Sequence, residues 1–277
     1  MKIHLVSYAT PRFRHRQVIL AASALANKVA DRVWAFSPAK VSRAGFSQRC
    51  PELNLNERGS GFWAWKPFII SKVLAEVPDG DVVFYCDVGR SFPLKQLTRP
   101  VHAFLDWMDA CQQEVMPGVL IPASGPMSMW TKRDAFVFTG MDRPEVHAAA
   151  PVQASFSLWK AGPQARALAE EWLSMAARRE LVSDDPGSCG INELPDFRDH
   201  RHDQSLLTLC CLKQGIQALD LNGALSDVDA KEPSLVAACL ERSPVAAVSF
   251  SGKMIDRVAR TMGCLETKFR GKAGSPA

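Results

Sequence analysis

The chain has 277 residues, of which 47% are hydrophobic and 22% are charged, as in an ordinary globular protein. This length is enough for the core of one large α/β domain. The net charge of +4 and the pI of about 8.6 suit an anionic small ligand or an acidic membrane surface. Without a clustered basic stripe, this charge is too weak to indicate nucleic acid.

The cysteines and the first residues bear on the compartment. The eight cysteines form no C-x-x-C pair, so the sequence predicts no zinc site. Several of them, such as Cys86, Cys210 and Cys211, lie in apolar runs, which favours a reducing, cytoplasmic compartment. Residues 1–7 favour a strand over a signal peptide, because their apolar run is short. No stretch has the length of a membrane span, and peripheral membrane contact stays open.

The chain begins with a pattern that predicts a parallel sheet. Strands are expected at residues 3–7 and 32–36, with a helix at 18–29 between them. Tyr8 and Thr10 follow the first strand, where a nucleotide-binding α/β fold often contacts the base or ribose. We therefore expect stacking by Tyr8 and hydrogen bonding by Thr10.

The most informative stretch lies between residues 59 and 90. Residues 81–86 (DVVFYC) form a β-branched and aromatic run that a Pro-Asp-Gly turn precedes, which predicts a buried strand. Asp87 follows at once, where α/β sheets bind ligands, so it is a candidate for handling a metal or a phosphate. The alternative is that Asp87 belongs only to a turn.

A lysine stands at the start of the helix that precedes this strand. Pro67 suits the first turn of a helix, and Lys66 comes just before it, between Trp65 and the proline. A cation at a helix N-terminus is unfavourable without a nearby anion, so Lys66 suggests an anionic ligand such as a phosphate. The alternative is that the neighbouring tryptophans are core residues and that Lys66 is solvated.

The rest of the chain continues the alternation of helices and strands. Helices are expected at 100–113, 163–180 and 206–214, and strands at 118–122, 152–159, 216–219 and 245–250, before a basic tail at 268–272. Residues 39–60 give no firm assignment. In the segment before the third of these helices, Asp203 is a natural N-cap. A catalytic role for Asp203 is compatible with that position.

Two blocks of this sequence are specific together. The first comprises residues 61–67 (GFWAWKP) and 80–89 (GDVVFYCDVG), and the second comprises residues 200–205 (HRHDQS). Both resemble bacterial GT-A-type glycosyltransferase-like proteins of the nucleotide-diphospho-sugar transferase superfamily. The second is also similar to the Asp-Gln motif of glycogenin-like and lipopolysaccharide galactosyltransferases. The resemblance implies a single GT-A-like, Rossmann-like domain with a mostly parallel sheet flanked by helices. Residues 1–113 would form its nucleotide-sugar half and residues 114–277 its acceptor half.

The resemblance also implies roles for individual residues. Asp203 would orient or deprotonate an acceptor hydroxyl, and Gln204 would hydrogen-bond a sugar. Gln153 would border the donor or acceptor sugar, unless it faces solvent. His202 and Asp203 are the ionisable pair in the half of the site that does not contain Asp87. Trp65 and Lys66 would contact the donor. The Asp-Gln motif favours retention of the sugar's configuration over inversion.

A divalent cation, Mn²⁺ or Mg²⁺, is the cofactor that this resemblance implies. GT-A enzymes usually bind it with an Asp-x-Asp pair at a strand end, but here Asp87 is followed by Val88 and Gly89. Metal binding is therefore in doubt. Either Asp87 is a metal ligand with help from a histidine, or Lys66 and arginines carry the diphosphate charge without a metal.

Three functions follow as hypotheses. The first is a cytoplasmic glycosyltransferase that takes a nucleotide-diphosphate sugar donor and a glycan or surface-polysaccharide acceptor. The second is a non-catalytic member of the same fold that binds a sugar or a partner protein. The absence of the second carboxylate of the Asp-x-Asp pair supports this hypothesis. The third is a metal-dependent hydrolase that uses His200, His202 and Asp203. The first requires both blocks to meet in one cleft.

Overall fold

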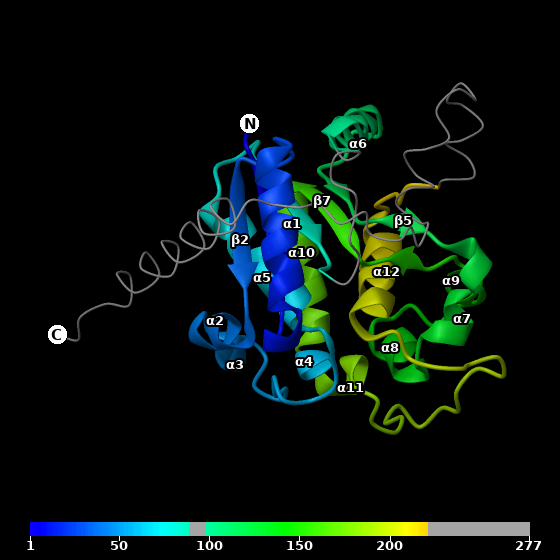
Figure 1. Ribbon diagram of the computed structural model, residues 1–277. Helices are drawn as coiled ribbons and strands as arrows, with labels where there is room; N and C mark the ends of the chain where they lie inside the picture. Colours follow the sequence, from blue (N-terminus) through cyan, green and yellow to red (C-terminus); the bar gives the residue numbers. More distant parts are fainter. Residues whose placement is uncertain (89–97, 221–277) are drawn as a thin grey trace.

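A five-stranded sheet forms the centre of the computed structural model, which describes residues 1–88 and 98–220 (Figure 1). The strands are β1 (Ile3–Tyr8), β2 (Arg32–Phe36), β3 (Val82–Cys86), β4 (Val115–Met116) and β7 (Phe156–Lys160). Their order is β2-β1-β3-β7-β4. Gly89, the expected strand at 245–250 and the basic tail at 268–272 lie outside the described residues.

The strand directions confirm the expectation of a mostly parallel sheet. β1 pairs in parallel with both β2 and β3. β7 pairs antiparallel with β3 and with β4, so four of the five strands run in one direction and β7 runs against them. A second, two-stranded sheet joins β5 (Val119–Leu120) to β6 (Val152–Gln153).

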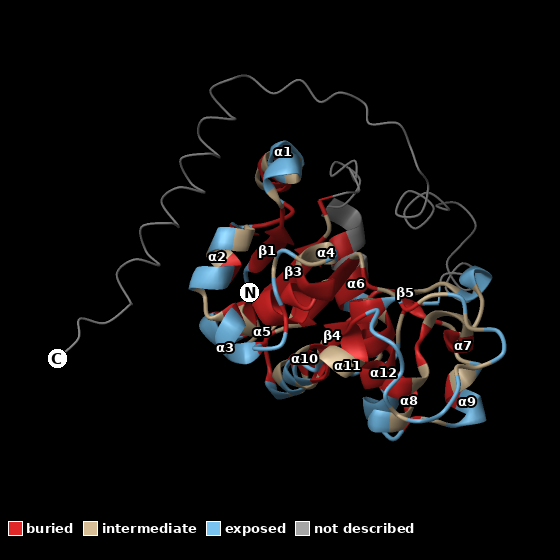
Figure 2. Ribbon diagram, turned by 90° about the horizontal axis from the view of Figure 1, so that it is seen from below, coloured by how far each residue is buried: buried red, intermediate tan, exposed pale blue. Residues whose placement is uncertain are grey.

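Helices cover both faces of the large sheet, and the side chains of β3 show why. All five of its residues are buried, so alternate side chains enter two separate cores. Val83 and Tyr85 pack with α5 (Trp65–Glu76), α10 (Pro163–Ala176) and α12 (His202–Gln214). Val82, Phe84 and Cys86 pack with α1 (Arg14–Ala26) and α6 (Thr98–Ala110). In Figure 2 the sheet at the centre of the molecule has the colour of buried residues. The α/β class with helices on both faces is as predicted.

Several elements differ from the sequence prediction. Residues 39–60 are largely ordered into short elements, because Ser37 caps a helix that starts at a proline and because Val41 and Phe46 are buried. The expected strand at 152–159 is two strands, β6 and β7, joined by a two-residue turn. Residues 216–219 contribute one bridge, between Leu219 and Val119. The remaining short elements are η1 (Pro11–Phe13), α2 (Pro38–Arg43), α3 (Phe46–Arg49), α4 (Gly59–Phe62), η3 (Pro122–Ser124), α7 (Met127–Trp130), α8 (Arg133–Phe138), α9 (Pro144–His147) and α11 (Arg179–Val182).

Two further features of the described chain concern its compartment. The six cysteines in residues 1–88 and 98–220 are free thiols. In this same part of the chain, no helix has both the length and the apolar character that crossing a membrane requires. Cys239 and Cys264 lie outside the described residues.

Candidate functional site

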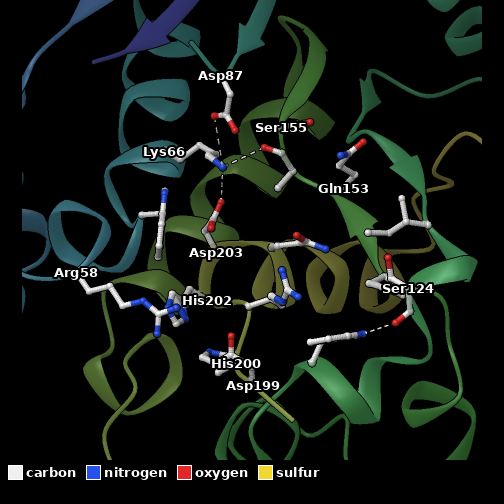
Figure 3. A pocket seen from close by; sticks show the side chains of 17 residues that line it. Arg58, Lys66, Asp87, Ser124, Gln153, Ser155, Asp199, His200, His202 and Asp203 are labelled. Atoms are coloured by element: carbon white, nitrogen blue, oxygen red, sulfur yellow. Dashed lines mark hydrogen bonds and ion pairs between the residues drawn. The ribbon is translucent and has the colours of Figure 1, made fainter. Parts of the chain in front are cut away.

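A cavity of about 550 Å³ lies at the carboxyl end of β3 and receives side chains from both predicted halves of the chain (Figure 3). Six of the nine residues singled out from the sequence line it: Lys66, Asp87, Gln153, His202, Asp203 and Gln204. The two sequence blocks therefore meet in one hollow. This is the convergence that the transferase hypothesis required.

Backbone hydrogen bonds fix the wall of the cavity beside β3. The N–H of Asp87 donates to the carbonyl of Ser155 at 2.9 Å, which ties the end of β3 to the turn between β6 and β7. The ammonium of Lys66 donates to the carbonyl of Ala154 at 3.0 Å. These bonds bring Gln153 to the same side as Asp87, so three segments that are distant in sequence share one wall.

Lys66 is the centre of the site. Its Nζ lies 2.6 Å from Asp203 Oδ2 and 3.9 Å from Asp87 Oδ1, and only 4% of the residue is exposed (Figure 3). The interpretation of Lys66 as a solvated residue is therefore wrong. The charge at the start of α5 is balanced by the chain's own carboxylates, so it is explained without an external phosphate.

Burial and charge shift the pKa values of this cluster. Burial raises the pKa of Asp203 to about 6, although the nearby Lys66 ammonium acts to lower it. For Lys66, burial acts to lower the pKa, but Asp203 and Asp87 outweigh it and the pKa is raised. Lys66 is therefore charged at neutral pH. Burial, and then Asp87, also raise the pKa of Tyr85, whose hydroxyl donates to the Asp87 carboxylate.

The helix α12 begins earlier than the sequence predicted. It starts at His202, and Arg201 occupies the N-cap position without a capping side-chain bond. Asp203 is therefore in the first turn and is not the N-cap, because its carboxylate pairs with Lys66. The indole of Trp172 donates to the Asp203 carbonyl at 2.9 Å and holds this turn against α10.

His202 enters the cavity within a group of rings. Its ring lies 5.1 Å from that of Trp63 and 5.7 Å from that of Phe62, and the residue is 2% exposed. Burial lowers the pKa of His202 to about 4, so the ring is neutral at pH 7. Neither ring nitrogen makes a hydrogen bond with the residues that the structure describes, although Nε2 lies 3.5 Å from Asp184 Oδ1, and the buried hydroxyl of Ser155 makes none either. Such buried atoms normally have partners, and both residues line the cavity.

The turn that presents Trp63 is left-handed. Residues 59–63 all have positive φ, with values of 61°, 58°, 82°, 52° and 60° in order, and His202 has φ of 48°. A left-handed conformation costs a residue other than glycine about 1–2 kcal/mol. Gly59 is required for a second reason, since a Cβ at this position would meet the Trp63 ring at 2.4 Å. The chain therefore holds strained backbone on both sides of the His202 ring.

His200 lines the cavity but is committed to the fold. Its Nε2 donates to the carbonyl of Leu181 at 2.8 Å, and its Nδ1 accepts from the N–H of Lys132 at 3.3 Å. Because both nitrogens are used, His200 is not available as a metal ligand. The hydrolase hypothesis thereby loses one of its three proposed groups.

Three predicted ligand-binding residues do not line the cavity. Tyr8 and Trp65 are buried and stack on each other with ring centroids 3.9 Å apart, and the Trp65 indole donates to the Gly59 carbonyl at 2.8 Å. Both are core residues that support the left-handed turn. Thr10 is half-buried before η1. Because packing uses the rings of Tyr8 and Trp65, neither ring is available to stack on a base in this arrangement.

The cavity also contains residues that the sequence did not single out. The guanidinium of Arg201 stacks over the Trp130 ring at 4.2 Å, and Arg58 pairs with Asp184 at 2.9 Å beside His202. These side chains come from α7 and from irregular segments without a local pattern. Arg201 lies within the second sequence block, which was the one signal that would have found it.

The residues present do not fit a divalent cation. In the described ranges, no group of three or more His, Cys, Asp or Glu side chains is placed to hold a metal. The two carboxylates that could begin such a site, Asp87 and Asp203, are both directed at Lys66. The divalent cation expected from the resemblance therefore stays a prediction. The described part of the chain contains no set of side chains placed to bind it.

The site thus combines a buried lysine shared by two carboxylates, unpartnered polar atoms and two indoles around one cavity. Its position beyond the carboxyl end of a parallel strand is where open α/β sheets bind ligands. No protein-family model, curated protein or solved structure matched the chain.

Proposed function

We propose that this protein is a glycosyltransferase that moves a sugar from a nucleoside-diphosphate sugar to a hydroxyl group of a glycan or surface-polysaccharide acceptor. The observation that carries the proposal is the contact of Lys66 with both Asp87 and Asp203, because it joins the two sequence blocks at one cavity. The free thiols in the described chain fit the cytoplasmic compartment that we propose for the reaction. Peripheral contact with a membrane-bound acceptor is compatible with it.

The chemistry of the lining supports a sugar ligand. The indoles of Trp63 and Trp130 offer apolar faces for a sugar ring, and the side-chain amides of Gln153 and Gln204 offer groups that both donate to and accept from hydroxyls. A volume of about 550 Å³ is in the ordinary range for a small-molecule site. Guanidinium groups suit the diphosphate, and Arg58 brings one to the cavity.

The proposed transfer step uses Asp203 as the proton acceptor. The acceptor oxygen bonds to the anomeric carbon, its proton passes to Asp203, and the bond from the anomeric carbon to the diphosphate oxygen breaks. The electron pair leaves with the nucleoside diphosphate. A carboxyl pKa of about 6 suits a base that works near neutral pH. Lys66 holds this carboxylate in place, and Gln204 positions the hydroxyl.

The test is a screen of UDP-, GDP- and dTDP-sugars for release of the nucleoside diphosphate, with and without Mn²⁺. Asp203→Asn should reduce turnover roughly 100- to 10,000-fold, the range for loss of a general base. Asp79→Asn is the matched control, because Asp79 is exposed, pairs with Arg166 and does not line the cavity. If no nucleoside diphosphate raises the melting temperature and no donor is turned over, the proposal fails.

A second candidate function is a protein that binds the sugar without turning it over. It is favoured by one observation: Asp203, the proposed base, is 5% exposed and already paired with Lys66. The same screen separates the two functions. Stabilisation by a nucleotide sugar without turnover of any donor would support the binding protein, and turnover lost in Asp203→Asn would support the enzyme.

A further inference from the structure

We infer that the ammonium of Lys66 permanently occupies the place of a cation between Asp87 and Asp203, so that the cavity works without a divalent metal. The inference deepens the proposed function, and its meaning for catalysis rests on that function. It reverses the cofactor expectation for this fold, in which carboxylates at the strand end would hold Mn²⁺ or Mg²⁺.

The oxygen atoms around Lys66 resemble those that a hard cation collects. Three segments each direct one oxygen at the Nζ atom: Asp203 Oδ2 from α12 at 2.6 Å, the Ala154 carbonyl from the β6–β7 turn at 3.0 Å, and Asp87 Oδ1 from the end of β3 at 3.9 Å. Carboxylate and carbonyl oxygens are also the ligands that Mg²⁺ and Ca²⁺ take. Here a lysine with three N–H donors uses them instead.

The surroundings keep the ammonium in this place. Lys66 is the second residue of α5 and is 4% exposed, so its side chain is held by the packing of the helix. The rings of Tyr85 and Trp65 lie 5.4 Å and 5.9 Å from Nζ, within the range of cation–π attraction. The Tyr85 hydroxyl also donates to Asp87, which fixes the outer carboxylate.

A divalent ion would therefore meet carboxylates that are already paired with an ammonium. It would have to displace a buried ammonium from Asp203, which would leave that charge buried without its partner, an arrangement that is strongly unfavourable. The remaining exposed oxygen of Asp87 is a single ligand. The cation of this site is thus part of the chain, and chelating agents cannot remove it.

The experiment measures Mn²⁺ binding to the full chain, without nucleotide, by electron paramagnetic resonance and by the shift in melting temperature. The wild type should show no saturable binding. Lys66→Ala opens the cation position and leaves the three oxygens, so it should gain one Mn²⁺ site and be stabilised by Mn²⁺. The double variant Lys66→Ala/Asp203→Asn should lose that site. Lys72→Ala is the matched control, because Lys72 lies on the same helix and pairs with Glu76.

Two results would overturn the inference. One is saturable Mn²⁺ binding by the wild type that Asp87→Asn abolishes, and this comparison decides the matter even where Lys66→Ala does not fold. The other is a folded Lys66→Ala that gains no Mn²⁺ site. Both readouts are independent of the proposed reaction. A wild type that binds neither Mn²⁺ nor any nucleoside diphosphate, and that turns over no donor, would refute the glycosyltransferase and leave this inference standing.

Discussion

His202 and Asp203 are adjacent, yet burial shifts their pKa values in opposite directions. Burial raises the pKa of Asp203 from its ordinary value of 3.8 to about 6, and lowers that of His202 from 6.5 to about 4. Both residues are at most 5% exposed, so solvent screens neither shift strongly. We predict that Asp203→Asn and His202→Gln change the pH dependence of stability in opposite senses.

The signs follow from the protons that each state binds. Between pH 3.8 and 6 the folded protein holds a proton on Asp203 that the unfolded chain releases, so this residue's contribution to stability is lost as pH rises. Between pH 4 and 6.5 the unfolded chain binds a proton at His202 that the folded protein does not, so that contribution is lost as pH falls. A pKa displaced by about two corresponds to about 3 kcal/mol. The two contributions therefore nearly cancel in the wild type.

The assay is urea unfolding of the wild type and both variants at intervals from pH 4 to pH 7, with the free energy of unfolding taken by linear extrapolation. As the pH rises from 4 to 7, the free energy of unfolding of Asp203→Asn should increase by about 3 kcal/mol relative to that of the wild type. That of His202→Gln should decrease by about 3 kcal/mol relative to the wild type over the same range. Groups whose pKa values are the same in all three proteins drop out of these differences. If both differences stay constant with pH, the assigned shifts are wrong.

Two further predictions test the surroundings of the cavity. Gly59→Ala should lower the free energy of unfolding by about 2–4 kcal/mol, because the position has a left-handed φ and the new Cβ would clash with Trp63. Gly80 has a similar φ but open space around it, so Gly80→Ala should cost only the backbone strain. Equal losses of stability for the two variants in urea unfolding would contradict the clash. For Asp134, burial acts to raise the pKa, but hydrogen bonds from Cys189 and Ser188 lower it to about 2. Its contribution of about 2 kcal/mol should be present above pH 3.8 and lost as pH falls toward 2. Asp134→Asn should therefore speed proteolysis near residue 188 at neutral pH, and an unchanged cleavage rate would refute this anchoring role.

Local patterns predicted the parts of the fold that local interactions determine. The run at 81–86 is apolar on both faces, and β3 is buried on both faces with Asp87 at its end. The direction of β7 was not predictable in this way. Nothing in residues 156–160 shows that this strand enters between β3 and β4 and runs against them, because that depends on the pairing of distant segments.

The site was predictable to the extent that its residues belong to the two blocks. Lys66 stood out because a positive charge is unfavourable at the start of a helix. The carboxylate that balances it, Asp203, belongs to a helix that is distant in sequence, so no local pattern predicts the pair. The left-handed turn was hidden for a different reason. Phe62 and Trp63 are bulky residues that rarely adopt positive φ, so no local propensity predicts the conformation that they have here.

Two carboxylates of the described chain that lie away from this cavity are well satisfied. Asp81 accepts bonds from His4 and the N–H of Lys2, and Asp134 accepts from the N–H groups of Ser188 and Cys189. At the cavity, by contrast, the neutral ring of His202 is held by strained backbone, and neither nitrogen makes a hydrogen bond with a described residue, although Nε2 lies 3.5 Å from Asp184. A chain selected only for stability would satisfy or replace such a residue. Because a bound ligand can supply the missing hydrogen bonds, we predict that occupancy of the cavity stabilises the fold.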